Sequence, residues 1–158
     1  MKRCGVVIVG GTFDQLHKGH EVILKRALKM GDKVIIGLVT DGFVRNLKPY
    51  SVESFEVRKE NLMKFLRKID ATDRAQVIPI VDSYGIGVSS KEVECIVVSE
   101  ETKERALEIN AIRVKRGLKP LEIVSVEMIL AEDGVPISST RIKKGLINRE
   151  GRMRRGLV

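Results

Sequence analysis

Two histidines spaced three residues apart, His17 and His20, follow an apolar run and a glycine pair near the start of the chain. The apolar run, residues 6–9, predicts a buried strand, and residues 22–28 have the spacing of apolar positions in a helix. Both imidazoles therefore lie where a strand leads into a helix, and at this spacing they can reach one ligand. A helix start after glycines also offers backbone N–H groups and the positive end of the helix dipole. This stretch predicts a site for nucleotide phosphates.

Two other glycine-rich phosphate sites are excluded by the residues that are missing. The dinucleotide pattern Gly-x-Gly-x-x-Gly is absent, because the first two glycines are adjacent and the next is Gly19. No Gly-Lys-Ser/Thr occurs, which excludes a Walker loop. A metal site built from Asp14, His17 and His20 stays open as an alternative, although no third strong ligand is evident.

Apolar runs alternate with amphipathic segments along the chain. The patterns predict strands at residues 4–9, 33–39, 76–81, 94–98 and 122–127, and helices at residues 18–30, 55–69, 100–116 and 139–147. Ser54 is expected to cap the second helix and Gly117 to end the third. Near-continuous Val and Ile suit strands buried on both faces. We therefore expect an α/β fold, a single doubly wound, five-stranded parallel sheet with helices on both faces and its ligand at the carboxyl ends of the strands.

Composition indicates one domain and a basic end. The 158 residues are 43% hydrophobic and 32% charged, and neither a membrane-length apolar run nor a signal-peptide pattern is seen, so we expect a cytoplasmic protein. The net charge is +8, and much of the excess lies after residue 140. We expect residues 1–148 to form the domain and residues 149–158 a basic, mobile tail. The tail attracts polyanions, but no aromatic residue interleaves with its charges, so nucleic acid is not the expected partner.

The two cysteines, Cys4 and Cys95, both lie at the edges of predicted strands. In a reducing compartment they are expected to be buried free thiols. They are too few to form a zinc site by themselves.

Two motifs carry a resemblance to a known superfamily. Residues 11–20 are similar to Gly-Thr-Phe-Asp-x-x-His-x-Gly-His of the nucleotidyltransferases with the HxGH signature, and residues 137–142 are similar to their late Ile-Ser-Ser/Thr-Thr-x-Ile. Two motifs in this order, about a domain apart, are far more specific than either alone. Residues 41–49, 97–102 and 109–113 further resemble archaeal-type phosphopantetheine adenylyltransferase. The resemblance covers about residues 5–147 and implies a Rossmann-like nucleotidyltransferase fold.

The family's reaction would join ATP and 4′-phosphopantetheine, giving dephospho-coenzyme A and pyrophosphate. A phosphomonoester is largely dianionic near neutral pH, since its second pKa is about 6. It can attack the α-phosphorus of ATP without a protein base, so the site must only align two anions and stabilise charge. The implied partners are ATP with its Mg²⁺ and 4′-phosphopantetheine, with no protein metal ligand and no membrane. The expected assembly is a monomer or a small homo-oligomer.

The resemblance also implies a role for each matching residue. His20 would stabilise the α/β-phosphate charge together with His17, Thr12 would orient the attacking phosphate, and Lys48 would bridge both anions. The implied ATP-binding residues are Gly11, Thr12, Phe13, His17, His20, Ser99, Ile137, Ser138, Ser139, Thr140 and Arg141, of which the last would clamp the phosphates. The implied acceptor-binding residues are Thr12, Lys48, Asp82 and Tyr84.

The segment after the fourth predicted strand departs from the bacterial form of the family, which carries an arginine-bearing Gly-Leu-Arg there. This chain has Ser-Glu-Glu-Thr at residues 99–102. Arg113 and Lys103 are the candidates to replace the missing charge.

The sequence leaves rival functions open. Within the superfamily the acceptor could instead be flavin mononucleotide or nicotinamide mononucleotide with ATP, or glycerol 3-phosphate with CTP. Residues 133–136, Asp-Gly-Val-Pro, argue against the cytidylyltransferase branch, which typically carries Arg-Thr-x-Gly before the second motif. The rival from another class is a non-enzymatic nucleic-acid-binding protein that uses the basic tail.

Overall fold

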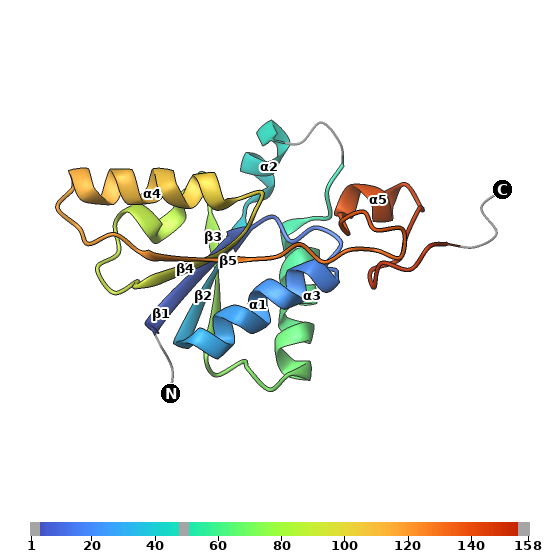
Figure 1. The fold of residues 1–158 in the computed structure, drawn as a ribbon, viewed down its shortest axis with the longest axis horizontal. Coiled ribbons are helices and arrows are strands. Elements are labelled where there is room, and N and C mark those ends of the chain that lie inside the picture. The colour runs from blue at the N-terminus through green and yellow to red at the C-terminus, as the bar shows by residue number, and fades with distance from the viewer. Residues whose placement is uncertain (1–3, 48–50, 155–158) are drawn as a thin grey trace.

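A five-stranded parallel sheet forms the centre of the molecule. The computed structural model describes residues 4–47 and 51–154. Its strands are β1 (Cys4–Gly11), β2 (Gly31–Val39), β3 (Ala75–Ile80), β4 (Cys95–Ser99) and β5 (Glu122–Val126). They pair in the order β3-β2-β1-β4-β5, so the chain reverses direction across the sheet at β1 (Figure 1). The doubly wound parallel sheet predicted from the apolar runs is confirmed.

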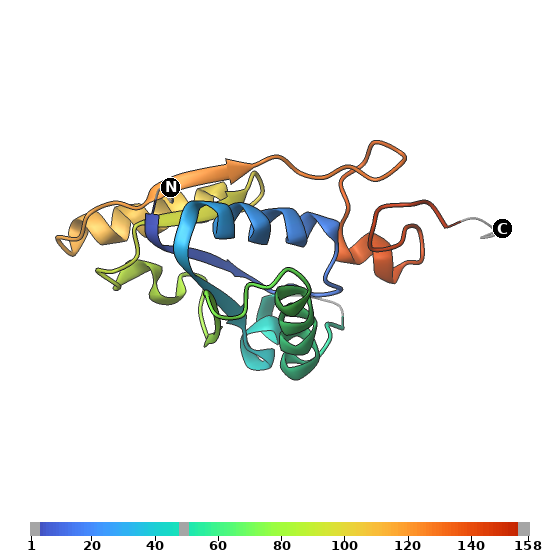
Figure 2. The ribbon, with the colours of Figure 1, turned by 90° about the horizontal axis from the view of Figure 1, so that it is seen from below.

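Helices cover both faces of this sheet. They are α1 (Lys18–Met30), α2 (Asp41–Leu47), α3 (Phe55–Lys68), the 3-10 helix η1 (Gly85–Val88), α4 (Lys103–Lys115) and α5 (Ser139–Lys143). One apolar cluster joins Val7 and Val9 of β1 to α1 and α3, and a second joins Ile8 of β1 to α4 and η1. Successive residues of β1 thus face opposite layers, which explains why its sequence is apolar throughout. Figure 2 shows α4 and α3 on opposite sides of the strands.

Local signals set most helix ends. Ser54 caps α3, because its Oγ accepts a hydrogen bond from the Val57 N–H at 3.3 Å. Gly117 follows α4 with a φ of +75°, the left-handed conformation that glycine tolerates best. The predicted 139–147 helix is too long: α5 ends at Lys143, and Gly145, also with a φ of +75°, turns the chain away. The short helix α2 was not predicted.

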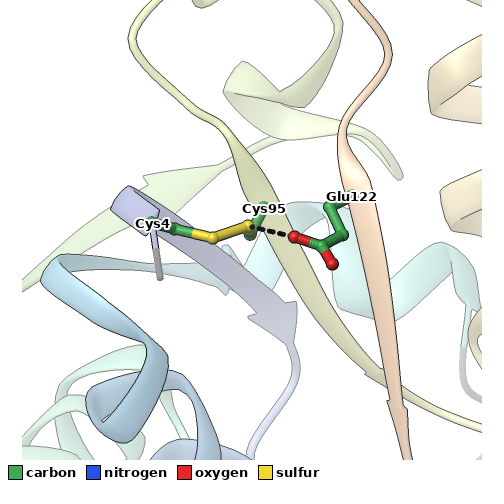
Figure 3. Close-up of side chains that lie close together, drawn as sticks. All are labelled: Cys4, Cys95 and Glu122. Atoms are coloured by element: carbon green, nitrogen blue, oxygen red, sulfur yellow. Dashed lines mark hydrogen bonds between the residues drawn. A yellow bond between two sulfur atoms is a disulfide. The ribbon is translucent and has the colours of Figure 1, made fainter. Parts of the chain in front are cut away.

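The prediction of two free thiols is wrong. Cys4 and Cys95 form a disulfide, although 91 residues separate them in sequence (Figure 3). Cys4 begins β1 and Cys95 begins β4, and these strands are neighbours in the sheet, which brings the two Cα atoms to 6.3 Å. The Glu122 carboxylate lies beside the bridge, with its Oε2 3.5 Å from the Cys95 Sγ. The sequence could not reveal this pair because sheet order is a tertiary property.

The segment after β5 folds against the carboxyl ends of the strands, where α5 lies (Figure 1). Its own small core contains Ala131, Ile137 and Ile147. The predicted tail begins inside this unit, because Gly151 is buried and its carbonyl accepts a hydrogen bond from the Glu132 N–H at 2.9 Å. The described part of the predicted tail, residues 149–154, is therefore hydrogen-bonded to the unit that precedes it, and the rest of the predicted tail lies outside the described residues. Within the described ranges, no helix has the length and apolar character needed to cross a membrane.

Candidate active site

A cavity of about 720 Å³ opens at the carboxyl ends of the strands. Its volume is in the range of small-molecule and cofactor sites. Most of the predicted site residues line it: Gly11, Thr12, Phe13, His17, His20, Asp82, Tyr84, Ser99, Ile137, Ser138, Ser139 and Arg141. Thr140 is not among the lining residues. Lys48 falls outside the described residues. The structure thus brings both sequence motifs to one cavity.

His17 and His20 cap the start of α1 reciprocally. His17 Nδ1 accepts the backbone N–H groups of Gly19 and His20 at 3.0 and 3.4 Å. In return, His20 Nδ1 accepts the His17 N–H at 3.1 Å. The two rings are stacked, with centroids 3.7 Å apart. Each ring is therefore held by the backbone of the other residue, and the pair forms one rigid unit.

The two imidazoles are neutral at pH 7. Burial lowers the pKa of His17 to about 4, with a further decrease from the Arg149 charge and an opposing increase from Asp14. Burial, followed by the neighbouring His17, holds the pKa of His20 well below its usual 6.5. Because Nδ1 of each neutral ring accepts a hydrogen bond, the ring proton lies on Nε2. Each Nε2–H is a donor, which suits an anionic ligand without adding a fixed charge.

This arrangement corrects one expectation. The N–H groups at the start of α1 are already bonded, those of Gly19 and His20 to His17 and that of Lys18 to the Arg149 carbonyl at 2.9 Å. They orient the imidazoles and do not form an open phosphate cradle. The helix dipole still points its positive end at the pair.

The loop before α1 has an unusual backbone. Phe13 and Gln15 have φ values of +52° and +51°, which non-glycine residues rarely adopt. Phe13 is buried and packs its ring 5.3 Å from that of His20. A Cβ on Gly19 would lie only 2.9 Å from Cε1 of His17, so glycine is needed for that ring to lie where it does. The strained backbone occurs where a site is expected.

Arg58 was missed by the sequence reasoning. Its side chain is fully buried and donates to the carbonyls of Thr12 and Val39 at 3.0 and 2.8 Å. It also donates to the Glu53 carbonyl and pairs with Asp41 at 3.0 Å. One guanidinium therefore ties the ends of β1 and β2 to the starts of α2 and α3. A signal was present, since Arg58 stands on the same helix face as the apolar residues of α3.

The predicted acceptor side is built around η1. Asp82 accepts the N–H groups of Tyr84 and Gly85 at 2.9 and 2.7 Å, so its carboxylate shapes this loop. The Tyr84 hydroxyl donates to Glu108 at 3.0 Å, and this bond raises the pKa of the phenol. Both Asp82 and Tyr84 reach the cavity, while their binding of an acceptor stays a prediction.

Neither proposed replacement for the bacterial arginine lies in the cavity. Arg113 is buried away from it and donates to the carbonyls of Gly87, Ser90 and Lys119. Lys103 is exposed and also does not line it. Arg105 of α4 does line the cavity, and nothing in the sequence distinguishes it from the other exposed basic residues of that helix.

The second motif forms the start of α5. Ser138 is the N-cap, and its Oγ accepts the Arg141 N–H at 3.2 Å. The Arg141 guanidinium pairs with Asp133, and this bond lowers the pKa of the Asp133 carboxyl. Arg141 therefore has to exchange this partner if it is to clamp a phosphate.

The metal alternative at the first motif lacks the required donors. Asp14 Oδ1 accepts the Glu53 N–H at 3.0 Å, and its Oδ2 pairs with Lys143. The Nδ1 atoms of both histidines are occupied as well. In the described part of the chain, the grouping with metal-ligand spacing is Cys4, Cys95 and Glu122, where the sulfurs are bonded to each other.

Comparison with known proteins places the chain in a family. Residues 8–145 match the model of the cytidylyltransferase-like family. A phosphopantetheine adenylyltransferase from Methanopyrus kandleri is 47% identical over 87% of this chain and 87% of its own length. One from Methanothermobacter thermautotrophicus is 44% identical over 95% and 90%. The chain belongs to the phosphopantetheine adenylyltransferase family.

Solved structures agree with the fold of this family member. A protein of unknown function from Archaeoglobus fulgidus is 34% identical, with a TM-score of 0.70 over 80% of this chain and 89% of its own. Pantoate–β-alanine ligase from Francisella tularensis, at 15% identity, has a TM-score of 0.60 over 91% of this chain and 66% of its own, which shows a shared fold alone.

Proposed function

We propose that this protein transfers the adenylyl group of ATP to 4′-phosphopantetheine, forming dephospho-coenzyme A and pyrophosphate. The observation that carries the proposal is the meeting of the two motifs: His17 and His20 share one cavity with Ser138, Ser139 and Arg141. The acceptor is taken from the relatives, which are named for phosphopantetheine. The reaction belongs to coenzyme A biosynthesis, and we place it in the cytoplasm.

The chemistry needs positioning and charge stabilisation rather than a protein nucleophile. An oxygen of the acceptor phosphate attacks the α-phosphorus of ATP, and the bond to the β-phosphate oxygen breaks, so that pyrophosphate leaves with the electron pair. In this proposal His20 Nε2–H donates to the α-phosphate, where negative charge builds up, and His17 supports the ring. Thr12 orients the attacking phosphate, which places the two reactants in line. No proton has to leave the dianionic acceptor.

Mg²⁺ is proposed to enter as part of the nucleotide substrate. Two carboxylates in or beside the motifs already have cationic partners, Asp14 with Lys143 and Asp133 with Arg141. Mg²⁺ usually keeps several of its waters and is bound through substrate phosphates with few protein ligands. Lys48 keeps its proposed role as a cation between the two substrates.

The test is pyrophosphate release from Mg²⁺-ATP with 4′-phosphopantetheine, measured beside flavin mononucleotide and nicotinamide mononucleotide, and beside glycerol 3-phosphate with CTP. We expect pyrophosphate release with phosphopantetheine and with none of the three rival acceptors. His20→Ala should lower kcat by about 100-fold or more while circular dichroism stays unchanged, because one charge-stabilising donor is typically worth that much. Release with a rival acceptor alone would overturn the acceptor assignment, and near-normal turnover in His20→Ala would overturn the role of the ring.

A further inference from the structure

Lys143 joins the second motif to the first. It stands in the last turn of α5, and its Nζ forms an ion pair with Oδ2 of Asp14. The same Nζ donates to the Ser51 carbonyl. The Asp14 side chain is 4% exposed, and its other oxygen accepts the Glu53 N–H. A buried carboxylate of this kind needs a cationic partner, and here the partner comes from the C-terminal unit.

Arg149 makes a second connection a few residues later. Its Nη2 donates to Oε1 of Gln15 at 3.1 Å and lies 3.9 Å from Oε2 of Glu53. Its carbonyl accepts the Lys18 N–H, so the side chain contacts the loop before α1 and the backbone contacts the first residue of the helix. Glu53 in turn accepts the Gln15 N–H at 2.8 Å. The residue predicted to begin a free tail is instead bonded on both sides of His17.

The loop before α1, which both contacts reach, has a backbone conformation that needs support. Phe13 and Gln15 both have positive φ, a conformation that costs free energy and persists only where neighbouring contacts enforce it. Neither Lys143 nor Arg149 lines the cavity, although Asp14 and His17 do. Any effect of the two basic residues on the site must therefore pass through the segment they contact, residues 14–18.

We infer that Lys143 and Arg149 form a C-terminal clasp, a pair of positioning residues that holds the His17 loop in its catalytic geometry. The inference rests on the proposed function for its kinetic part. The Arg149 side chain is 47% exposed, so its ion pair with Glu53 contributes little to global stability. The Lys143 pair differs, because it neutralises a buried carboxylate, and its loss should also destabilise the fold. Loss of the Arg149 contact should therefore affect turnover more than unfolding, which makes Arg149 the decisive residue for the test.

The clasp also sets the charge around His17. The groups that act on this imidazole come from three parts of the chain: Arg149 of the C-terminal unit, Asp14 of the loop and the stacked His20 of α1. Lys143 neutralises Asp14, and Glu53 lies beside Arg149. Arg149 lowers the pKa of His17 and Asp14 raises it, so removing the Arg149 charge should raise the pKa of His17 from about 4.

The experiment compares clasp variants with neighbours of the same type. Arg149→Gln is paired with Arg152→Gln, and Lys143→Gln with Lys144→Gln, since Arg152 and Lys144 are exposed basic residues of the same unit. We expect kcat to fall about tenfold or more in the clasp variants, because a misplacement of about 1 Å can cost about 100-fold. The control variants should keep wild-type kcat. Arg149→Gln and both controls should unfold at nearly the wild-type temperature, whereas Lys143→Gln should unfold at a lower temperature because the buried Asp14 loses its cationic partner.

Proton NMR supplies a readout that does not depend on turnover. The chain has two histidines, so the two imidazole Cε1–H signals can be followed without interference, and His20→Asn identifies the signal of His17. The pKa of His17 should rise in Arg149→Gln and stay unchanged in Arg152→Gln. Arg149→Lys should restore the low pKa, because it returns the charge, and most of kcat.

The outcomes separate the two proposals. If wild type releases pyrophosphate but Arg149→Gln matches it in kcat and in the pKa of His17, the clasp is wrong and the proposed function stands. If wild type releases none, the proposed function fails, and the NMR titration still decides whether Arg149 acts on His17. If Arg149→Gln loses kcat only in proportion to a loss of folded protein, the positioning role of Arg149 is wrong.

Discussion

At the scale of single residues, the histidine pair is held in place because each ring accepts a hydrogen bond from the other residue's backbone. The hydrogen bonds to Nδ1 leave the proton on Nε2, and burial keeps both rings neutral at pH 7. A neutral donor fits a reaction in which charge shifts between phosphates but no proton is transferred. Gly19 completes the unit, since any side chain there would collide with the His17 ring.

The low histidine pKa values predict how stability depends on pH. The unfolded chain takes up a proton at His17 near pH 6.5, while the folded chain does so only near pH 4. In that window the unfolded state binds more protons, so the free energy of unfolding falls as the pH falls. His17 alone should account for about 3 kcal/mol, at about 1.4 kcal/mol per pKa unit, and His20 acts in the same direction. Urea unfolding between pH 7 and pH 4 measures this.

His17→Asn is the matched variant for that titration, because asparagine keeps a side-chain acceptor at the N-cap of α1. Its unfolding free energy should depend less steeply on pH over the same range. An equally steep dependence in the variant would show that other groups control it.

At the scale of elements, the site depends on where strands end and helices begin. Arg58 joins the carbonyl just after β1 to the last carbonyl of β2, and through Asp41 it fixes the start of α2, the helix that precedes Lys48 in the chain. Arg113 serves a similar purpose on the other face, where it binds carbonyls at and after η1. Both are arginines on buried helix faces, and both satisfy carbonyls that would otherwise be unpaired in the interior.

Arg58→Lys should lower both stability and turnover. A lysine ammonium cannot reproduce a planar fork that donates to several acceptors at once, so buried carbonyls lose their partners. The expected loss of unfolding free energy is about 3 kcal/mol, measured by urea unfolding, and kcat should fall because Thr12 is no longer anchored. Arg67→Lys is the control, since that residue lies on the same helix with an exposed ion pair to Glu60. Equal effects in the two variants would contradict the anchoring role.

At the scale of the whole molecule, neither the positions of the basic charges nor the pairing of the cysteines follows from the composition. Three basic residues of the C-terminal region form ion pairs within the domain: Arg141 with Asp133, Lys143 with Asp14 and Arg149 with Glu53. Arg149 is the one of these three that lies in the predicted tail, and its charge is used in a contact within the domain. The disulfide lies at the starts of β1 and β4, at the end of the sheet opposite the cavity.

Removing the disulfide should lower stability without affecting turnover. Closing a loop of about 90 residues restricts the unfolded chain, which is worth about 4.6 kcal/mol in the chain-entropy model. Cys4→Ser with Cys95→Ser, or reduction confirmed by thiol titration, should therefore lower the thermal midpoint. The kcat at moderate temperature should stay at the wild-type value, because the bridge is remote from the cavity. An unchanged midpoint, or a loss of kcat below the unfolding transition, would contradict this.

The sequence by itself determined the parallel sheet, most of its helices and the two motifs. Continuous Val and Ile in β1 and β4, and the spacing of His17 and His20, are local patterns that need no partner to be read. Only the tertiary structure decided which distant residues meet: Cys4 with Cys95, Lys143 with Asp14, and Arg149 with the loop before α1. The reason is physical, since strand order and the packing of the last residues bring together groups whose separation in sequence carries no information about their distance in space.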